Sequence, residues 1–121
     1  MSTRALYTFI DQNNVYHVYK HHDGYPSGAY EWISGALMFA WNLPRFEAAE
    51  FSAAFVAANK TGSGGVYLST GNHRDLSYRY EISESSFYEN MLHIKAFSMP
   101  ENKIIFEGTL NDFKSFENTG E

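Results

Sequence analysis

The residues best suited to chemistry are crowded into positions 19–28, which read Tyr-Lys-His-His-Asp-Gly-Tyr-Pro-Ser-Gly. Imidazole and carboxylate groups can hold a metal ion or transfer protons, and His21, His22 and Asp23 place three of them side by side. The segment joins a strand pattern to a helix pattern, and loops carried by a rigid scaffold commonly perform the function of a domain. It is therefore the first candidate for a functional site.

A metal site at this segment meets a geometric objection. His73 and Asp75 could contribute ligands from a distant loop. However, adjacent side chains in an extended segment point to opposite sides, so His21 and His22 are poorly placed to share one ion. No recognised ligand spacing is present. We therefore predict no metal and no cofactor, and retain a small His/Asp metal-binding protein or enzyme as an alternative.

The glycines of residues 24–28 suggest a second kind of site. Backbone N–H groups at the start of a helix can hold an anion, although the sequence matches neither common phosphate-loop pattern. With an aromatic pocket between the sheet and the first helix, such a turn would make a small-ligand-binding module, which is a further alternative. The other glycine-rich stretch, residues 61–65, follows a helix and precedes a strand, so we interpret it as a connector.

Composition excludes several classes of function. The formal net charge is −5, and no run of Lys and Arg is present, which argues against binding to nucleic acid. There are no cysteines, so disulfides and thiolate chemistry are excluded. We find neither a signal peptide nor an apolar stretch suited to crossing a membrane, and we predict a cytoplasmic protein. Aromatic residues make up 17% of the chain, more than a small core readily buries, which favours a binding surface.

Two β-rich runs at the N-terminus predict a hairpin. Residues 4–10 and 15–20 flank Asp11-Gln12-Asn13-Asn14, whose side chains favour a tight turn. The expected cross-strand pairs are Ile10 with Val15, Phe9 with Tyr16, Thr8 with His17, and Tyr7 with Val18. Both faces of this hairpin are then largely apolar, so one face needs the helices and the other needs a cover, another strand or a partner. A homo-oligomer through the N-terminal hairpin is one such arrangement.

Two helices are expected next. Over residues 27–43 the apolar positions recur with helical spacing. The stripe consists of Ala29, Trp32, Ile33, Ala36, Leu37, Ala40 and Trp41. Ser27 can cap its start, and Leu43-Pro44 is expected to end it. A second, alanine-rich helix is predicted over residues 45–59.

The rest of the chain has the pattern of strands and a final short helix. Short alternating segments predict strands, a turn is expected at residues 99–102, and Thr109 opens a capping box. Arg79, Glu81, His93 and Lys95 are expected on one solvated sheet face. The predicted fold is a single α+β domain over residues 1–121, of order ββααββββα, with a mostly antiparallel sheet and two main helices on one face.

Four segments together resemble a known group of proteins. They are residues 18–28, with the His-x-Asp-Gly-Tyr-Pro element, and residues 43–51, 53–60 and 75–82. The chain is similar here to small uncharacterised proteins carried by bacteriophages, including viruses of marine cyanobacteria, over roughly residues 4–112. The resemblance implies a viral accessory protein made in the host bacterial cytoplasm. It brings no activity, so no catalytic residue is assigned.

The function expected from these observations is the binding of a host protein without catalysis. The aromatic surplus, the two-sided hairpin and the lack of an assembled active site all favour this interpretation. We expect the binding surface to lie on the segment that opens the first helix, with support from the loop around residue 73. The predicted binding residues are Tyr19, His21, His22, Asp23, Tyr25, His73 and Arg74.

Overall fold

The computed structural model describes residues 3–40, 46–60, 65–71, 75–84 and 92–119. In these residues the elements follow the order ββααββββα, as predicted. The strands are β1 (Ala5–Ile10), β2 (Val15–Lys20), β3 (Val66–Ser69), β4 (Tyr78–Glu84), β5 (Leu92–Ser98) and β6 (Lys103–Thr109). The helices are α1 (Pro26–Leu37), α2 (Ala48–Asn59) and α3 (Leu110–Thr119).

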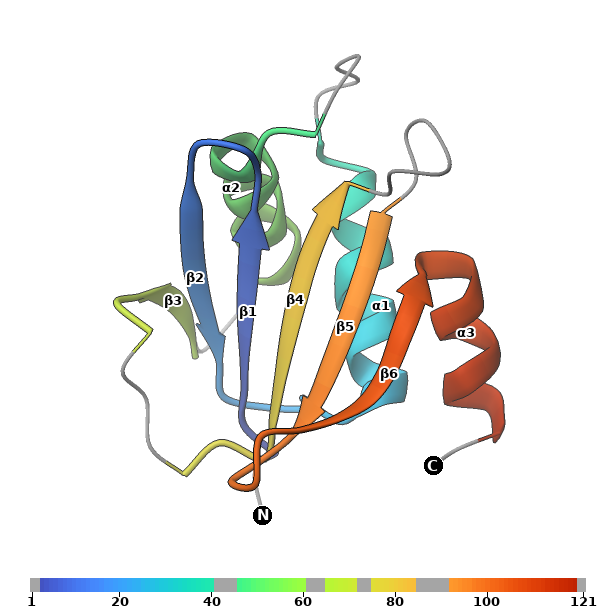
Figure 1. Cartoon of the computed structure of the whole chain (residues 1–121). Helices are drawn as coiled ribbons and strands as arrows, with labels where there is room; N and C mark the ends of the chain where they lie inside the picture. The colour runs from blue at the N-terminus through green and yellow to red at the C-terminus, as the bar shows by residue number, and fades with distance from the viewer. Residues whose placement is uncertain (1–2, 41–45, 61–64, 72–74, 85–91, 120–121) are drawn as a thin grey trace.

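The strands form one sheet in the order β3-β2-β1-β4-β5-β6. Neighbouring strands are antiparallel except for β1 and β4, which are parallel. Helices α1 and α2 cover one face of this sheet, and α3 packs beside β6 (Figure 1). In the described residues, no helix covers the opposite face (Figure 1). The predicted α+β class, with a mostly antiparallel sheet and its helices on one face, is confirmed.

The N-terminal hairpin has the predicted register. Thr8 lies opposite His17 and Tyr7 opposite Val18, and Asp11 accepts the backbone N–H groups of Asn13 and Asn14 at 2.8 Å, which closes the turn. The hairpin lies inside the sheet, because β3 pairs with β2 and β4 pairs with β1. Both of its edges are therefore hydrogen-bonded, and a homo-oligomer built on this hairpin would have to use its open face.

Aromatic side chains fill the space between the sheet and the helices. Tyr7 and Phe9 of β1 point toward α2, where the Tyr7 ring lies 4.7 Å from that of Phe55. The rings of Tyr7 and Tyr80 are stacked 5.2 Å apart across the parallel pair. Alternate residues of the central strands are therefore committed to the core, as period-two patterning requires.

The helix boundaries differ from those predicted. Proline at residue 26 takes the first helical position, so Tyr25 is the N-cap and makes no side-chain capping bond, and the predicted Ser27 cap is wrong. Helix α1 ends at Leu37, earlier than expected, and the predicted stop at Leu43-Pro44 lies outside the described residues. The capping bond at α3 is present, since Asp112 N–H donates to Thr109 Oγ1 at 3.2 Å.

Candidate functional site

Residues 21–25 form the β2–α1 connector, which runs past the ends of the central strands and enters α1 behind the sheet (Figure 1). Hydrogen bonds join its backbone to the segment before β3, to the N-terminal segment and to β4. His21 N–H donates to the Gly65 carbonyl at 2.8 Å, and Gly24 N–H donates to the Thr3 carbonyl at 2.9 Å. The buried Tyr80 hydroxyl donates to the Gly24 carbonyl at 2.6 Å. The connector is thus a fixed segment, in keeping with a site that presents side chains in one geometry.

The spacing of Asp, Gly, Pro and Gly in this segment is explained by packing. Asp23 adopts a left-handed conformation (φ 57°), and its carbonyl accepts the Trp32 indole N–H at 2.9 Å. A Cβ on Gly28 would overlap that same carbonyl oxygen, so only glycine permits this approach. The Asp23 carbonyl therefore lies against the first turn of α1, at the place where the sequence suggested that an anion could bind. Sequence reasoning assigned Trp32 to the helical stripe and missed this bond.

Four aromatic rings meet where β2 enters the connector. The buried Tyr19 ring lies 5.0 Å from that of Tyr67 and 5.9 Å from that of His21. The His21 and His22 rings meet edge to face at 4.7 Å. Sequence analysis placed these two histidines on opposite sides of an extended chain, and that expectation is wrong because β2 ends at Lys20 and the chain then bends.

Hydrogen bonding and desolvation both bear on the protonation of His21. The Tyr19 hydroxyl and His21 Nδ1 are 2.7 Å apart. Desolvation, followed by the charges of His22 and Arg4, lowers the pKa of His21, which favours the neutral ring. A neutral imidazole has one donor and one acceptor nitrogen. If Tyr19 donates to Nδ1, Nε2 is left as the donor.

A buried lysine lies beneath the connector. Lys20 Nζ donates to the His22 carbonyl at 3.1 Å and lies 4.1 Å from the centre of the Trp32 ring. Burial lowers the pKa of Lys20, and the Asp23 carboxylate acts in the opposite direction. Cation–π contact and a carbonyl acceptor compensate for part of the desolvation of this ammonium group. Lys20 therefore supports the connector from the helix side.

The predicted binding residues fall into three groups. His22, Asp23 and Tyr25 are exposed, with Tyr25 at 37%, while His21 is half-buried. Tyr19 is buried at 5% exposure, so it supports the histidines from beneath. The other two predicted residues, His73 and Arg74, lie outside the described residues.

The loop that precedes β4 contributes a charge to the same end of the sheet. Asp75 lies 3.8 Å from Arg4. Leu76 of this loop packs on Leu6 and Tyr19. Across the described part of the chain, no three His, Asp or Glu side chains are grouped so that they could hold a metal ion.

The open sheet face carries paired charges. Arg79, Glu81, His93 and Lys95 share this face as predicted. The Arg79 guanidinium lies 2.6 Å from Glu81 and stacks 3.9 Å from the centre of the Phe97 ring, and His93 lies 3.3 Å from Glu107. Charges of both signs neutralise one another here, so this face has the character of a solvated structural surface.

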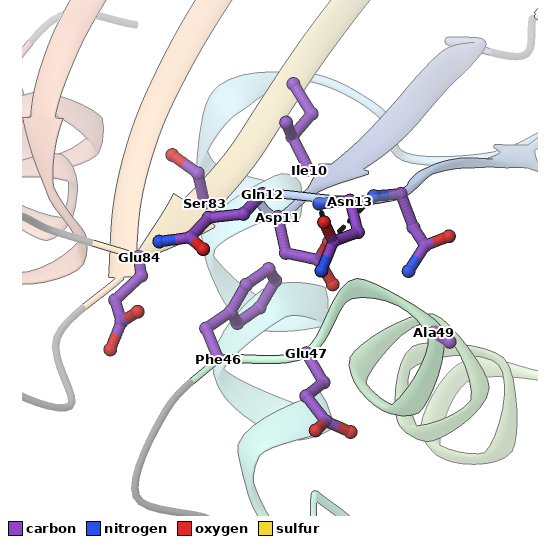
Figure 2. A pocket seen from close by; sticks show the side chains of 10 residues that line it. Ile10, Asp11, Gln12, Asn13, Phe46, Glu47, Ala49, Ser83 and Glu84 are labelled. Atoms are coloured by element: carbon purple, nitrogen blue, oxygen red, sulfur yellow. Dashed lines mark hydrogen bonds between the residues drawn. The ribbon is translucent and has the colours of Figure 1, made fainter.

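A pocket of about 650 Å³ lies at the opposite end of the sheet, between the β1–β2 turn, the start of α2 and the end of β4 (Figure 2). The Phe46 ring lines the pocket and lies among polar side chains, including those of Asp11 and Gln12 (Figure 2). Its lining comprises Ile10, Asp11, Gln12, Asn13, Asn14, Phe46, Glu47, Ala49, Ser83 and Glu84. Sequence analysis did not find this pocket, because elements distant in the chain assemble it.

Asp11 joins the two sides of this pocket. One carboxylate oxygen closes the β1–β2 turn, and the other accepts the Ala48 N–H at the start of α2, at 2.8 Å. A carboxylate at this position also interacts favourably with the helix dipole. Asp11 is thus committed to holding the turn against α2.

Comparison with known proteins identifies no relative. No protein-family model, no curated protein and no solved structure matches the chain. None of the helices in the described residues is long and apolar enough to cross a membrane.

Proposed function

We propose that this protein binds another protein, without catalysis, through the exposed side chains of the connector. The contact surface consists of His21, His22, Asp23 and Tyr25, and we call it the connector surface. The observation that carries the proposal is the anchoring of this segment at Gly65, Thr3 and Tyr80. A backbone held in one conformation loses less entropy on association, which favours binding.

The chemistry of the connector surface suits a protein partner. Tyrosine and histidine combine an apolar ring with a polar edge, which lets them contact both kinds of surface. The Tyr19–His21 contact restrains the His21 ring, and His22 packs against it. Asp23 is one of the 14 acidic residues that give the chain its formal net charge of −5. A partner with a basic and aromatic patch would complement this surface.

The resemblance to bacteriophage proteins supplies a context for the proposal. A viral accessory protein made in the host cytoplasm would bind a host protein. Such a role requires a surface rather than a reaction centre. In the described residues, a hydroxyl lies beside an imidazole nitrogen at Thr8 and His17, 2.9 Å apart, and at Tyr19 and His21, 2.7 Å apart. Thr8 is only 4% exposed and Tyr19 only 5%, so neither residue is presented to a substrate.

The proposal is tested by quantitative affinity purification from lysate of a bacterial host. The bait proteins are the wild type, the double variant His22→Ala/Tyr25→Ala, and the control Met38→Ala/Ile104→Ala. The control removes two exposed apolar side chains elsewhere on the surface. We expect a partner that is retained by the wild type and the control and lost with the connector variant.

A purified candidate partner then provides the decisive measurement. Its dissociation constant should rise roughly tenfold or more for the connector variant, since exposed aromatic anchors contribute a large share of binding energy. The same partner should bind the control with unchanged affinity. Equal affinities for all three proteins would contradict the proposal.

A second candidate function, small-ligand binding, is supported by the pocket beside the β1–β2 turn. Its apolar part is formed by Ile10, Phe46 and Ala49, and its rim carries carboxylates and amides. Such a lining suits a small molecule with an apolar body and donor groups. A thermal-shift screen with amines and amides, repeated with Ser83→Leu, tests it. A ligand whose shift survives in Ser83→Leu, or no shift at all, would contradict binding in this pocket.

A further inference from the structure

The two edges of the sheet differ in their protection against pairing. β6 carries the charged residues Lys103 and Glu107, and its pairing with β5 contains an irregularity at Ala96/Phe97. Charges and bulges are devices that keep edge strands from pairing with other chains. At the other edge, β3 reads Val-Tyr-Leu-Ser, with no charge and no proline. β3 thus lacks the side-chain protection that β6 has.

The register between β2 and β3 determines which backbone groups of β3 face outward. Lys20 lies opposite Val66, so the next pair along the two strands is His21 with Gly65. His21 N–H donates to the Gly65 carbonyl, which makes His21 and Gly65 a hydrogen-bonded pair. Hydrogen-bonded and non-hydrogen-bonded pairs alternate in an antiparallel ladder. Val66 and Leu68 therefore point their N–H and C=O groups away from β2. In the described residues no strand pairs with them on that side.

One of these outward groups already has a partner. Lys60, just after α2, donates its ammonium to the Val66 carbonyl at 3.2 Å. At Leu68, neither the N–H nor the C=O points to another strand, and the side chain is 71% exposed on the helix side of the sheet. The centre of the available edge is therefore Leu68.

We propose that a second copy of this chain docks on this edge, with the two β3 strands antiparallel about a two-fold axis at Leu68. Charge, and the closure of the assembly at two copies, both favour a second copy of the chain as the partner. Self-pairing places only uncharged residues opposite one another, whereas pairing of β3 with β6 would bring in Lys103 and Glu107. Self-pairing also closes after two copies, while β3–β6 pairing would continue indefinitely.

The arrangement satisfies the backbone and covers the exposed leucines. Leu68 of each copy donates its N–H to the Leu68 carbonyl of the other, and the two side chains lie beside one another. Val66 then lies opposite Thr70 of the second copy. Lys60 keeps its bond to the Val66 carbonyl, because a carbonyl oxygen accepts two hydrogen bonds. The product is one continuous sheet with the helices of both copies on the same face.

The first experiment measures oligomeric state by sedimentation over a range of protein concentrations. Leu68→Lys adds a charge opposite its own copy, and Leu68→Pro removes an N–H that takes no part in the ladder with β2. Each should raise the dimer dissociation constant roughly tenfold or more: Leu68→Pro because two hydrogen bonds are lost, and Leu68→Lys because like charges meet at the two-fold axis. The control Ile104→Lys places the same charge on β6, at a residue that is 50% exposed, and should leave the dimer intact.

The second experiment uses the absence of cysteine from the chain. Leu68→Cys introduces a single thiol on the two-fold axis, where the Cα separation of about 5.5 Å allows a disulfide. Mild oxidation should cross-link this variant to a covalent dimer. Ile104→Cys, which lies on the other edge, should form no covalent dimer under the same oxidation.

Three results would overturn the proposal. These are a wild type that is monomeric at the highest concentration reached, a dimer that Leu68→Lys does not weaken, and a dimer that Ile104→Lys weakens equally. Circular dichroism of each variant separates a lost interface from lost folding. If Leu68→Pro does not fold, Leu68→Lys and the cross-linking comparison still decide the question.

Discussion

Tyr7 and Tyr80 lie side by side in neighbouring strands, fully buried and stacked at 5.2 Å, yet their hydroxyl groups differ. The Tyr80 hydroxyl donates to the Gly24 carbonyl at 2.6 Å. The Tyr7 hydroxyl has no hydrogen-bond partner among the described residues, and burial raises its pKa. Replacing each tyrosine by phenylalanine therefore separates the contribution of the hydrogen bond to the connector from the contribution of ring packing.

Tyr80→Phe should destabilise the protein by about 1–3 kcal/mol, because it leaves the Gly24 carbonyl without this donor while it keeps the ring. Urea denaturation followed by fluorescence measures the change in the free energy of unfolding. Affinity for a partner of the connector surface should fall as well, because the connector loses one of its anchors. A variant as stable as the wild type would contradict the role given to this bond.

Tyr7→Phe should have no measurable cost, or should stabilise the protein by up to about 1 kcal/mol, since it removes a buried hydroxyl without a described partner. The same denaturation experiment measures it. Because the two tyrosines share burial and ring contacts, each variant serves as the control for the other. If both substitutions cost the same, the two hydroxyls do not differ in hydrogen bonding.

Gly28→Ala should destabilise the protein by about 1–3 kcal/mol, since its Cβ would overlap the backbone carbonyl of Asp23. Gly35→Ala in the same helix is the matched control. Among the described residues, no atom outside the neighbouring helix backbone lies within 4 Å of a Cβ there, so alanine should stabilise the helix by up to about 1 kcal/mol. Thermal unfolding of both variants measures the contrast. Equal effects would mean that the close approach at Gly28 is unimportant.

Asp11→Ala should cost about 1–2 kcal/mol, as the loss of a helix cap usually does, because three backbone N–H groups lose their acceptor. Gln12→Ala, an exposed neighbour in the same turn, should be nearly neutral. Chemical denaturation of the two variants gives the comparison. A small effect at Asp11 would show that water replaces the carboxylate.

Local patterns in the sequence were sufficient for the elements and the hairpin. Alternation of apolar residues and the Asp-Gln-Asn-Asn turn predicted the pairing of Tyr7 with Val18, which the structure has. The same patterns did not reveal that β1 would pair in parallel with β4, because that contact joins segments far apart in the chain. The strand order of a sheet depends on such non-local pairings.

The candidate site was predicted in part. Position in a connector correctly placed His22, Asp23 and Tyr25 on the surface. Tyr19 is buried, because its strand position faces Leu6 and Leu76. The bonds from Tyr80 and Trp32 to the connector could not be found from sequence, since each joins the segment to a side chain that apolar patterning assigned to the core or a helical stripe.

Stability should fall as the pH decreases from about 7.5 to 5.5, and His17 should contribute to this fall. Burial, with Arg79 second, lowers the pKa of His17 in the folded protein. The unfolded chain therefore binds a proton first, near its ordinary pKa of about 6.5, and gains stability relative to the folded state. The contribution of neutral His17 is complete above that pH and is lost as the pH falls toward the folded pKa.

His17→Gln should reduce this dependence, because glutamine can hydrogen-bond to Thr8 but does not titrate. The free energy of unfolding of the variant and the wild type is measured at pH 7.5 and 5.5. The pKa of His21 is also lowered, so part of the slope should remain in His17→Gln and disappear in the double variant with His21→Gln. A slope unchanged by both substitutions would place the pH dependence on other groups.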